Sequence, residues 1–458
     1  MLMRLGSNAA ANLLTGASSM VFQLALTAMA ARSFDHATFS VWTLAVSMAA
    51  LTPLFAINLS SVVTRQLVGA AVSGSVDQQA MVVRAARRVA LILAAFAVFA
   101  VAAASVLLYR RSPELAHAHE AEFILAVLVL TGGQLWQIGL QPSFGWHYAH
   151  ERNWPVAGVF ALVRGGGLVA MWLGFSVMTG NFFVAALCVA LGSWIGLAVA
   201  EFGFFAPKIR SSQRGAAMSR QVRETTHLAM GFAFWSIAIA AIQYGLPPLM
   251  SILNTPDYNA FYLAYSLNLV LAGIVGSAGA ALLAPLTRMR LRGEQDVLVR
   301  RLMWVTLACA AFLILALAGF RLGMNFIVHY WSAGIATGAA VNGYLYILGF
   351  QTIARAMAIP FASVLSSAAR PMQLIAPSLL ELGLMVCVAI PLGLAFGSKV
   401  FLMVLPAAGL AAAISTTLVA TRIGGFKPQD RRGLLWRFCA AELAALALWQ
   451  LLSLVTVR

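Results

Sequence analysis

Arg164 is an ionisable side chain inside an apolar run, GVFALVRGGGLVAMW, which covers residues 158–172. If that run crosses a membrane, its guanidinium costs about 2.5–3.5 kcal/mol unless it finds a partner or a water-filled cavity. Two interpretations stay open. One is a cationic site for an anionic group such as a pyrophosphate or an acidic sugar, since a guanidinium matches phosphate geometry. The other is an internal ion pair with Glu201. The glycines 165–167 favour close approach of a helix or a ligand.

Glu381 is the second ionisable group placed deep in an apolar run, within SLLELGLMV. A carboxyl at that depth either exchanges protons or cations, or pairs with a cation and holds two helices together. The sequence leaves both roles open. Glu381 and Glu201 are therefore the candidate coupling or ion-pair carboxylates.

Neutral polar side chains also lie on the faces that we expect to point inward in the first, second, seventh and eighth helices. Amides and aromatic rings of this kind bind sugars, but they also join helices through hydrogen bonds worth about 0.6 kcal/mol each. Arginines near expected helix ends normally extend to lipid head groups. The polar candidates are Gln23, Asn58, Gln243, Tyr244 and Asn268, and the arginines are Arg32, Arg65, Arg321 and Arg355, of which Arg32 and Arg65 are retained as pathway candidates.

The elements that carry these residues follow from composition. Of 458 residues, 61% are hydrophobic and 10% charged, and the mean hydropathy is +0.87. That composition excludes a soluble enzyme, a disordered protein and a nucleic-acid binder, because too little polar surface is present. Lipid admits only helices or closed barrels, and a helix needs about 20 apolar residues to cross. We predict thirteen spans: 7–31, 38–62, 88–109, 122–145, 155–178, 182–206, 228–252, 259–286, 302–321, 336–358, 372–396, 400–420 and 436–456.

The distribution of charge supports these spans. The net charge is +16, and Lys and Arg divide 23 to 6 between the two sides when the loops are assigned alternately. Cytoplasmic loops carry the excess of basic residues in membrane proteins. The N-terminus is therefore predicted to be cytoplasmic and the C-terminus, after thirteen spans, to lie outside.

Two basic segments divide the chain. We predict an N-terminal six-helix lobe over 1–206, a cytoplasmic linker over 207–227, a C-terminal six-helix lobe over 228–420, and a further linker and helix over 421–458. The expected fold is an all-α polytopic membrane protein with two six-helix lobes around a central cavity, plus one or two extra C-terminal helices. The outward loops are too short for a catalytic domain, and the chain has no Walker or GxSxG motif. We therefore expect no enzyme, no metal site and no cofactor.

Residues 31–67 carry a family resemblance. The stretch ARSFDHATFSVWTLAVSMAALTPLFAINLSSVVTRQL resembles the start of Wzx-type polysaccharide flippases, of the multidrug/oligosaccharidyl-lipid/polysaccharide exporter superfamily. Residues 257–289 and 365–397 are similar to the eighth-helix and eleventh-helix regions of the family. The chain departs from the pattern with Ser33-Phe34 where members often have Leu-Gly, and with Ser40 in place of a Gly. The matching positions are Arg32, Phe39, Trp42, Asn58, Leu59, Ser60, Arg65 and Pro285.

The resemblance implies a multi-pass protein of the bacterial inner membrane. Such a protein flips undecaprenyl-pyrophosphate-linked oligosaccharide to the periplasmic leaflet for O-antigen, capsule or exopolysaccharide synthesis, by alternating access through a cationic cavity. Its partners would be that lipid-linked glycan, the bilayer and the polysaccharide polymerase and export machinery, and no nucleic acid. Three alternatives remain: a drug/cation antiporter of the same superfamily, a membrane enzyme of glycan assembly, and a non-transporting scaffold.

Overall fold

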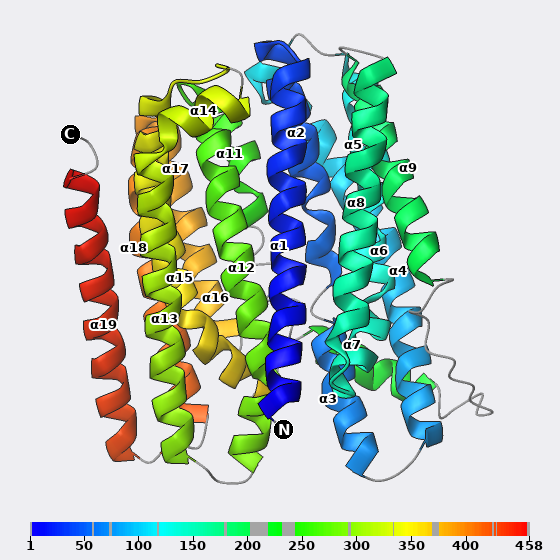
Figure 1. Cartoon of the computed structure of the whole chain (residues 1–458), viewed down its shortest axis with the longest axis vertical. Coiled ribbons are helices and arrows are strands. Elements are labelled where there is room, and N and C mark those ends of the chain that lie inside the picture. Colours follow the sequence, from blue (N-terminus) through cyan, green and yellow to red (C-terminus); the bar gives the residue numbers. More distant parts are fainter. Residues whose placement is uncertain are drawn as a thin grey trace. The chain divides into compact units, whose positions relative to one another are not determined.

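The computed structural model is built of helices, as Figure 1 shows. It describes residues 2–56, 59–72, 76–116, 119–177, 181–201, 219–230, 243–291, 295–332, 334–368, 375–423, 426 and 428–455. These residues contain no strand, which confirms the predicted all-α class. They form two compact units, Met1–Ile252 and Leu253–Arg458.

Twelve helical segments among the described residues are long and apolar enough to cross a membrane. Each coincides with one of the thirteen predicted spans. The remaining span, 228–252, includes residues 231–242, which lie outside the described residues.

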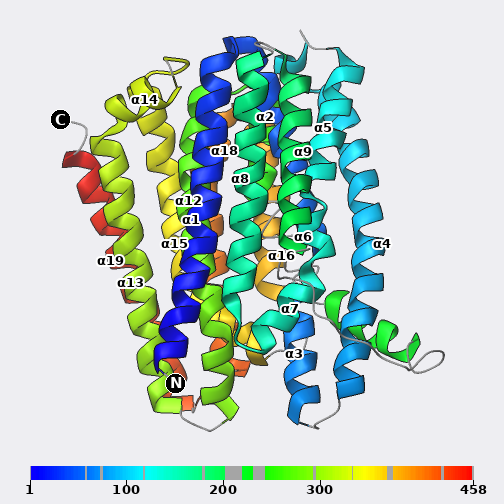
Figure 2. The ribbon, with the colours of Figure 1, turned by 45° about the vertical axis from the view of Figure 1, so that its right-hand side comes forward.

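The first unit contains long and broken helices. The packed pairs are α8 with α9, α1 with α8, α3 with α7 and α5 with α9. In both views α8 lies between α1 and α9 (Figures 1 and 2). The elements are α1 (Leu2–Ser33), α2 (His36–Ala49), η1 (Thr52–Ala56), α3 (Leu59–Val72), α4 (Val76–Tyr109), η2 (Pro113–Leu115), α5 (Glu120–Gln134), α6 (Trp136–Gly139), α7 (Gln141–Ala149), α8 (Asn153–Val177), α9 (Phe182–Ala200) and α11 (Leu246–Ile252).

Glycine decides how closely α8 and α9 pack. A Cβ built on Gly166 of α8 would overlap the carbonyl oxygen of Gly192, and one on Gly196 of α9 would overlap that of Leu162. Small residues at such contacts let helix backbones approach in membranes. The predicted role of glycines 165–167 in close helix approach therefore holds for Gly166, whereas a Cβ on Gly165 would meet nothing.

The second and fourth spans are broken, and polar groups join their broken parts. The backbone N–H of Ser60 in α3 donates to Gln141 Oε1 in α7 at 3.1 Å. The Thr64 hydroxyl of α3 donates to the Gly145 carbonyl of α7 at 3.1 Å. Backbone groups freed by a helix break need such partners in lipid. These contacts stabilise α3 against α7.

The second unit is arranged around α15, which packs most extensively against α12 and α18. Pro360 lies inside α15 and Pro406 inside α18, and a five-residue π-helix interrupts the eleventh span. Gly397, at φ 92°, makes the turn into α18. The elements are α12 (Tyr258–Leu291), α13 (Gln295–Leu322), α14 (Met324–Ser332), α15 (Gly338–Ala368), α16 (Ile375–Leu384), η5 (Met385–Ala389), α17 (Ile390–Phe396), α18 (Ser398–Ile423) and α19 (Pro428–Val455).

The extents of the two compact units and the end of one span differ from the predicted ranges. The first unit extends to Ile252, because α11 packs against α2 and η2 and Ser251 hydrogen-bonds Glu114. The last helix, α19, belongs to the second unit and packs against α13, α15 and α18. The tenth span, predicted to end at 358, continues to Ala368 through Pro360.

Candidate functional site

In the first unit, Arg164 projects from α8 toward α1 and Tyr244. Its Nη1 donates to the Thr15 carbonyl oxygen of α1 at 3.3 Å. Its guanidinium carbon lies 4.7 Å from the ring centroid of Phe160, a cation–π contact. Tyr244 is near enough to interact electrostatically. The structure thus brings together two of the predicted pathway residues, Arg164 and Tyr244.

An aromatic cluster fixes the position of that arginine. Phe160 lies 5.0 Å from Trp136 and 5.5 Å from Phe144, measured between ring centroids. Trp136 and Phe144 are buried in a core shared by α6, α7 and α8. The ring below the Arg164 guanidinium is therefore held by well-packed neighbours.

The alternative pairing of Arg164 with Glu201 is not formed. Glu201 follows the last residue of α9 and is exposed. No ion pair joins the two residues, and no other acidic side chain among the described residues pairs with Arg164. Arg164 is half-buried and has no carboxylate partner among the described residues.

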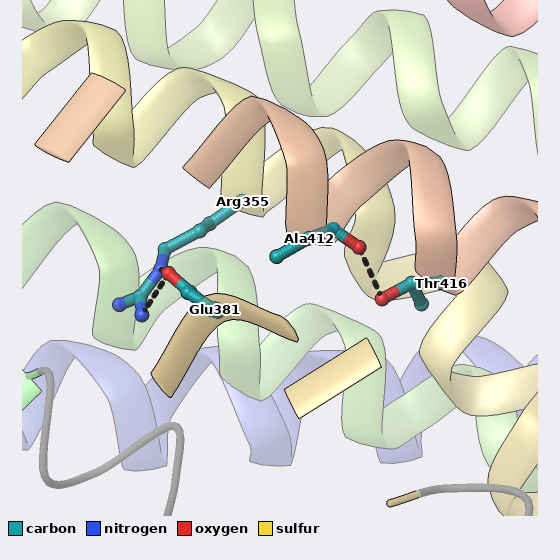
Figure 3. Close-up of polar contacts among 4 residues, drawn as sticks. All are labelled: Arg355, Glu381, Ala412 and Thr416. Carbon is teal, nitrogen blue, oxygen red and sulfur yellow. Dashed lines mark hydrogen bonds and ion pairs between the residues drawn. The ribbon is translucent and has the colours of Figure 1, made fainter. Parts of the chain in front are cut away.

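In the second unit, Glu381 of α16 pairs with Arg355 of α15 (Figure 3). The Arg355 Nε donates to Glu381 Oε1 at 2.7 Å, and Nη2 lies 2.5 Å from the same oxygen. The side chain of Glu381 is 4% exposed and that of Arg355 18%. Two roles were left open for Glu381. The geometry matches the second of them, an ion pair that joins two helices.

Arg355 corrects an expectation. It was placed near a helix end, where it would extend to head groups, but α15 runs on to Ala368 and Arg355 lies well inside it. The helix continues because the segment after Arg355 is apolar and its backbone must stay hydrogen-bonded in lipid. An arginine this deep needs the partner that Glu381 supplies.

The polar contacts continue along α15. Thr352, three residues before Arg355 and on the same face, donates to Asn268 Oδ1 of α12 at 3.0 Å. The Asn268 amide donates in turn to the Ala264 carbonyl at 3.3 Å. On α18, the Thr416 hydroxyl donates to the Ala412 carbonyl at 2.8 Å, as Figure 3 also shows. The predicted Asn268 is thus part of a buried polar layer that joins α12, α15 and α16.

The other predicted residues are more dispersed. Gln23 of α1 is half-buried, and its carbonyl accepts a hydrogen bond from Thr27. Gln243, next to Tyr244, is half-buried. Arg32 and Arg65 are exposed, at the end of α1 and within α3. Asn58 lies outside the described residues.

Two ionisable groups in the second unit lie where the sequence did not place them. Glu442, which the sequence analysis did not single out as a candidate, lies near the middle of α19 at 0% exposure, and neither carboxyl oxygen has a hydrogen-bond partner among the described residues. Arg321, expected to extend to head groups, is 5% exposed and lies against two aromatic rings. The sequence did contain an indication that Glu442 is buried, because the apolar run of the last helix extends on both sides of it.

Searches at the level of sequence find no relatives: no family model and no curated protein matches the chain. Solved structures do match it. The eukaryotic MATE transporter AtDTX14 aligns at 15% identity and a TM-score of 0.69, over 97% of this chain and 98% of that one.

Two further structures agree with this match. A MOP superfamily transporter from Pyrococcus furiosus, described as having a binding pocket of reverse polarity, aligns at 12% identity and a TM-score of 0.67, over 92% of this chain and 95% of that one. The Vibrio cholerae MATE transporter VcmN, as a D35N mutant, aligns at 13% identity and a TM-score of 0.65, over 92% and 96%. The chain therefore has the fold of MATE transporters of the MOP superfamily.

Proposed function

We propose that this protein is a flippase that moves undecaprenyl-pyrophosphate-linked oligosaccharide from the cytoplasmic to the periplasmic leaflet of a bacterial inner membrane. The glycan would serve surface polysaccharide synthesis, and the protein would work by alternating access alongside a polymerase and export machinery. The observation that carries the proposal is the sign of the deep charges. Arg164 has no acidic partner among the described residues, whereas the buried carboxylate Glu381 is neutralised by Arg355.

An anionic substrate fits this arrangement. A guanidinium binds phosphate oxygens through charge-assisted hydrogen bonds, which are stronger than neutral ones. The Arg164 guanidinium already makes one weak hydrogen bond, at 3.3 Å, and rests on an aromatic ring, so it can rotate its other N–H groups toward a ligand. The Tyr244 hydroxyl beside it adds a group that can donate to a sugar or phosphate oxygen.

The second candidate is a drug/cation antiporter. It is favoured by the fold, since one similar structure is described as a multidrug resistance MATE transporter. A cation antiporter needs a carboxylate that is free to exchange its cation. The described residues include two deep carboxyls. Glu381 is paired with Arg355, and Glu442 lies on the last helix, α19. The similar MOP superfamily transporter is described as having a binding pocket of reverse polarity that suggests a different function, so the fold is compatible with more than one function.

The test is flipping in reconstituted vesicles. A fluorescent polyprenyl-pyrophosphate oligosaccharide is followed with a glycosidase or lectin that reaches only the outer leaflet, with and without a membrane potential or a pH gradient. We expect the wild-type protein to flip the lipid and Arg164→Ala to slow it severalfold. Arg164→Lys, which keeps the charge without the planar fork, should fall between the two.

Arg88→Ala is the matched control, because Arg88 is an exposed arginine of α4. It should flip at the wild-type rate. Size-exclusion profiles show whether each variant is folded. Uptake of organic cations by wild-type protein, with no flipping of any lipid-linked glycan, would reject the flippase in favour of the antiporter.

A further inference from the structure

Arg321 is a buried cation with no anionic partner among the residues that the structure describes. It lies in the last turn of α13, and its residue is 5% exposed. Neither Nε nor Nη1 has a hydrogen-bond partner in the described part of the chain. No acidic side chain among the described residues lies within ion-pair distance of it. An unpaired buried charge costs several kcal/mol, so this guanidinium calls for a partner.

The Arg321 guanidinium lies near two aromatic rings, and hydrogen bonds hold both rings in place. Its guanidinium carbon lies 5.3 Å from the ring centroid of Tyr346 in α15 and 5.7 Å from that of Trp449 in α19. The Tyr346 hydroxyl donates to Gln450 Oε1 at 2.6 Å, and the Trp449 indole N–H donates to the Tyr346 carbonyl at 3.2 Å. These bonds fix both rings, so the arginine has a defined position between α13, α15 and α19.

The depth of Arg321 suits a lipid head group. It is the penultimate residue of α13, at the end of the ninth predicted span. The short helix α14 follows after one residue and leaves the direction of α13 (Figure 1). Its Phe326 and Tyr330 are 67% and 57% exposed, as is typical of aromatic side chains at a membrane interface. The unpaired N–H groups therefore lie near the level where lipid phosphates are found.

We propose that Arg321, with Tyr346 and Trp449, binds the phosphate of an anionic phospholipid head group. The phosphate oxygens would accept from the Arg321 guanidinium, whose Nε and Nη1 have no partner among the described residues. The acyl chains would lie in the bilayer beside α13 and α19. The site is separate from Arg164 and Tyr244 and does not depend on the proposed transport activity.

The test is lipid binding to the purified full-length protein, measured by native mass spectrometry and by thermal stabilisation in detergent. The probes are phosphatidylglycerol, phosphatidylcholine and inorganic phosphate. We expect phosphatidylglycerol to bind and raise Tm in the wild-type protein, and Arg321→Gln to weaken its binding roughly tenfold or more. Arg300→Gln is the matched control, because it removes an exposed arginine near the other end of α13.

Each outcome decides the proposal. If Arg321→Gln does not fold, Trp449→Leu keeps the arginine and removes one ring, and it should weaken phosphatidylglycerol binding severalfold. Equal binding to wild type and to a folded Arg321→Gln variant overturns the proposal. Binding of inorganic phosphate alone, lost in Arg321→Gln, would overturn the lipid and leave a phosphate site.

Discussion

The buried carboxyls of the second unit differ in what surrounds them. Glu381 accepts a hydrogen bond from Arg355 and neutralises it, whereas the Glu442 oxygens have no hydrogen-bond partner within the described residues. Removing one partner of a buried pair leaves an uncompensated charge and costs roughly 3–5 kcal/mol. Replacing the Glu442 carboxyl, which forms no hydrogen bond with the described residues, leaves no partner uncompensated and carries no such penalty. The same substitution should therefore have different effects at the two positions.

We expect Glu381→Gln to lower the free energy of unfolding by about 3 kcal/mol, since it leaves the Arg355 guanidinium unpaired. Glu442→Gln should change it by less than about 1 kcal/mol, because an amide of nearly the same shape replaces a group that forms no hydrogen bond. The measurement is the Tm of each purified variant in the same detergent.

A double variant separates the pair from the individual side chains. Arg355→Gln combined with Glu381→Gln should be more stable than either single variant, since no charge is left unpaired. Equal and additive losses would mean that the two side chains do not interact in the folded protein.

Helix positions follow closely from the sequence, because long apolar runs predict spans with little ambiguity. The breaks and kinks within the helices do not follow from the sequence in the same way. The break between α5 and α7 has no proline until Pro142, and the tenth span continues past its predicted end at 358, through Pro360. Inside a membrane, neighbouring helices and polar side chains supply the partners that a proline removes. Near Pro360, Thr306 of α13 donates to the Met357 carbonyl at 3.4 Å, one residue after the Ala356 carbonyl that the proline leaves without its helical donor.

The contact between α8 and α9 predicts that alanine has different effects at two adjacent glycines, Gly165 and Gly166. Gly166→Ala places a methyl group on the Gly192 carbonyl, so the helices must separate, at a cost of about 1–3 kcal/mol. Gly165→Ala meets nothing within 4 Å and gains helix propensity, so it should be neutral or stabilising by up to about 1 kcal/mol. Thermal unfolding of the two variants side by side measures the difference. Equal Tm values would show that α8 and α9 do not pack through Gly166.

Asp35 is the N-cap residue of α2, and its carboxylate leads to a prediction about how the stability of the protein depends on pH. It lies between the first two spans, and its carboxylate accepts from the Thr38 backbone N–H at 2.7 Å. That hydrogen bond lowers the pKa of Asp35 below its ordinary value of 3.8. A lowered pKa means that the cap stabilises the folded state above pH 4, and that this stabilisation is lost as the pH falls through the folded-state pKa.

Asp35→Ala should lower the free energy of unfolding by about 1 kcal/mol at pH 7, and the difference from wild type should shrink at acidic pH. Asp35→Asn keeps an acceptor for Thr38 and should stay close to wild type at pH 7. Unfolding is followed between pH 7 and pH 3. A loss in Asp35→Ala that is the same at both ends of this range would mean that the charge of the cap does not matter.

For the whole chain, the sequence predicts the class and the order of spans, but it does not reveal which charges meet. Arg164 and Tyr244 are 80 positions apart, and nothing in their spacing indicates that they are neighbours. Arg355 and Glu381 lie on different helices, and their pairing depends on the length of α15. The deep ionisable residues were identifiable because charge is rare in apolar runs. Their partners depend on helix packing, which a single sequence does not specify.

Helix directions within the first unit also bear on the number of crossings. The N-termini of α1 and α8 lie together, since the Asn153 amide donates to Asn12 Oδ1 at 3.1 Å. Glycines 166 and 192 show that α9 runs antiparallel to α8, so Glu201 returns to that same end. The turn at η2 packs against α2, which follows the opposite end of α1.

Ser251 hydrogen-bonds Glu114 of this η2 turn, so it lies at the end of the unit opposite to Glu201. Glu201 and Ser251 therefore lie at opposite ends of the first unit, which is compatible with the odd number of crossings that the thirteen-span prediction gives. An odd number of crossings places the two termini on opposite sides of the membrane. With the basic loops cytoplasmic, the N-terminus should be inside and the C-terminus outside.

Reporter fusions at residue 458 measure this directly. Alkaline phosphatase, active only outside the cytoplasm, should be active there, and a fluorescent protein that matures only in the cytoplasm should stay dark. Fusions at residue 430, in the first turn of α19, are the control and should give the reverse pattern, because the rest of that helix separates the two positions. A fluorescent C-terminus would mean an even number of crossings, and the charge distribution across the loops would then have to be assigned again.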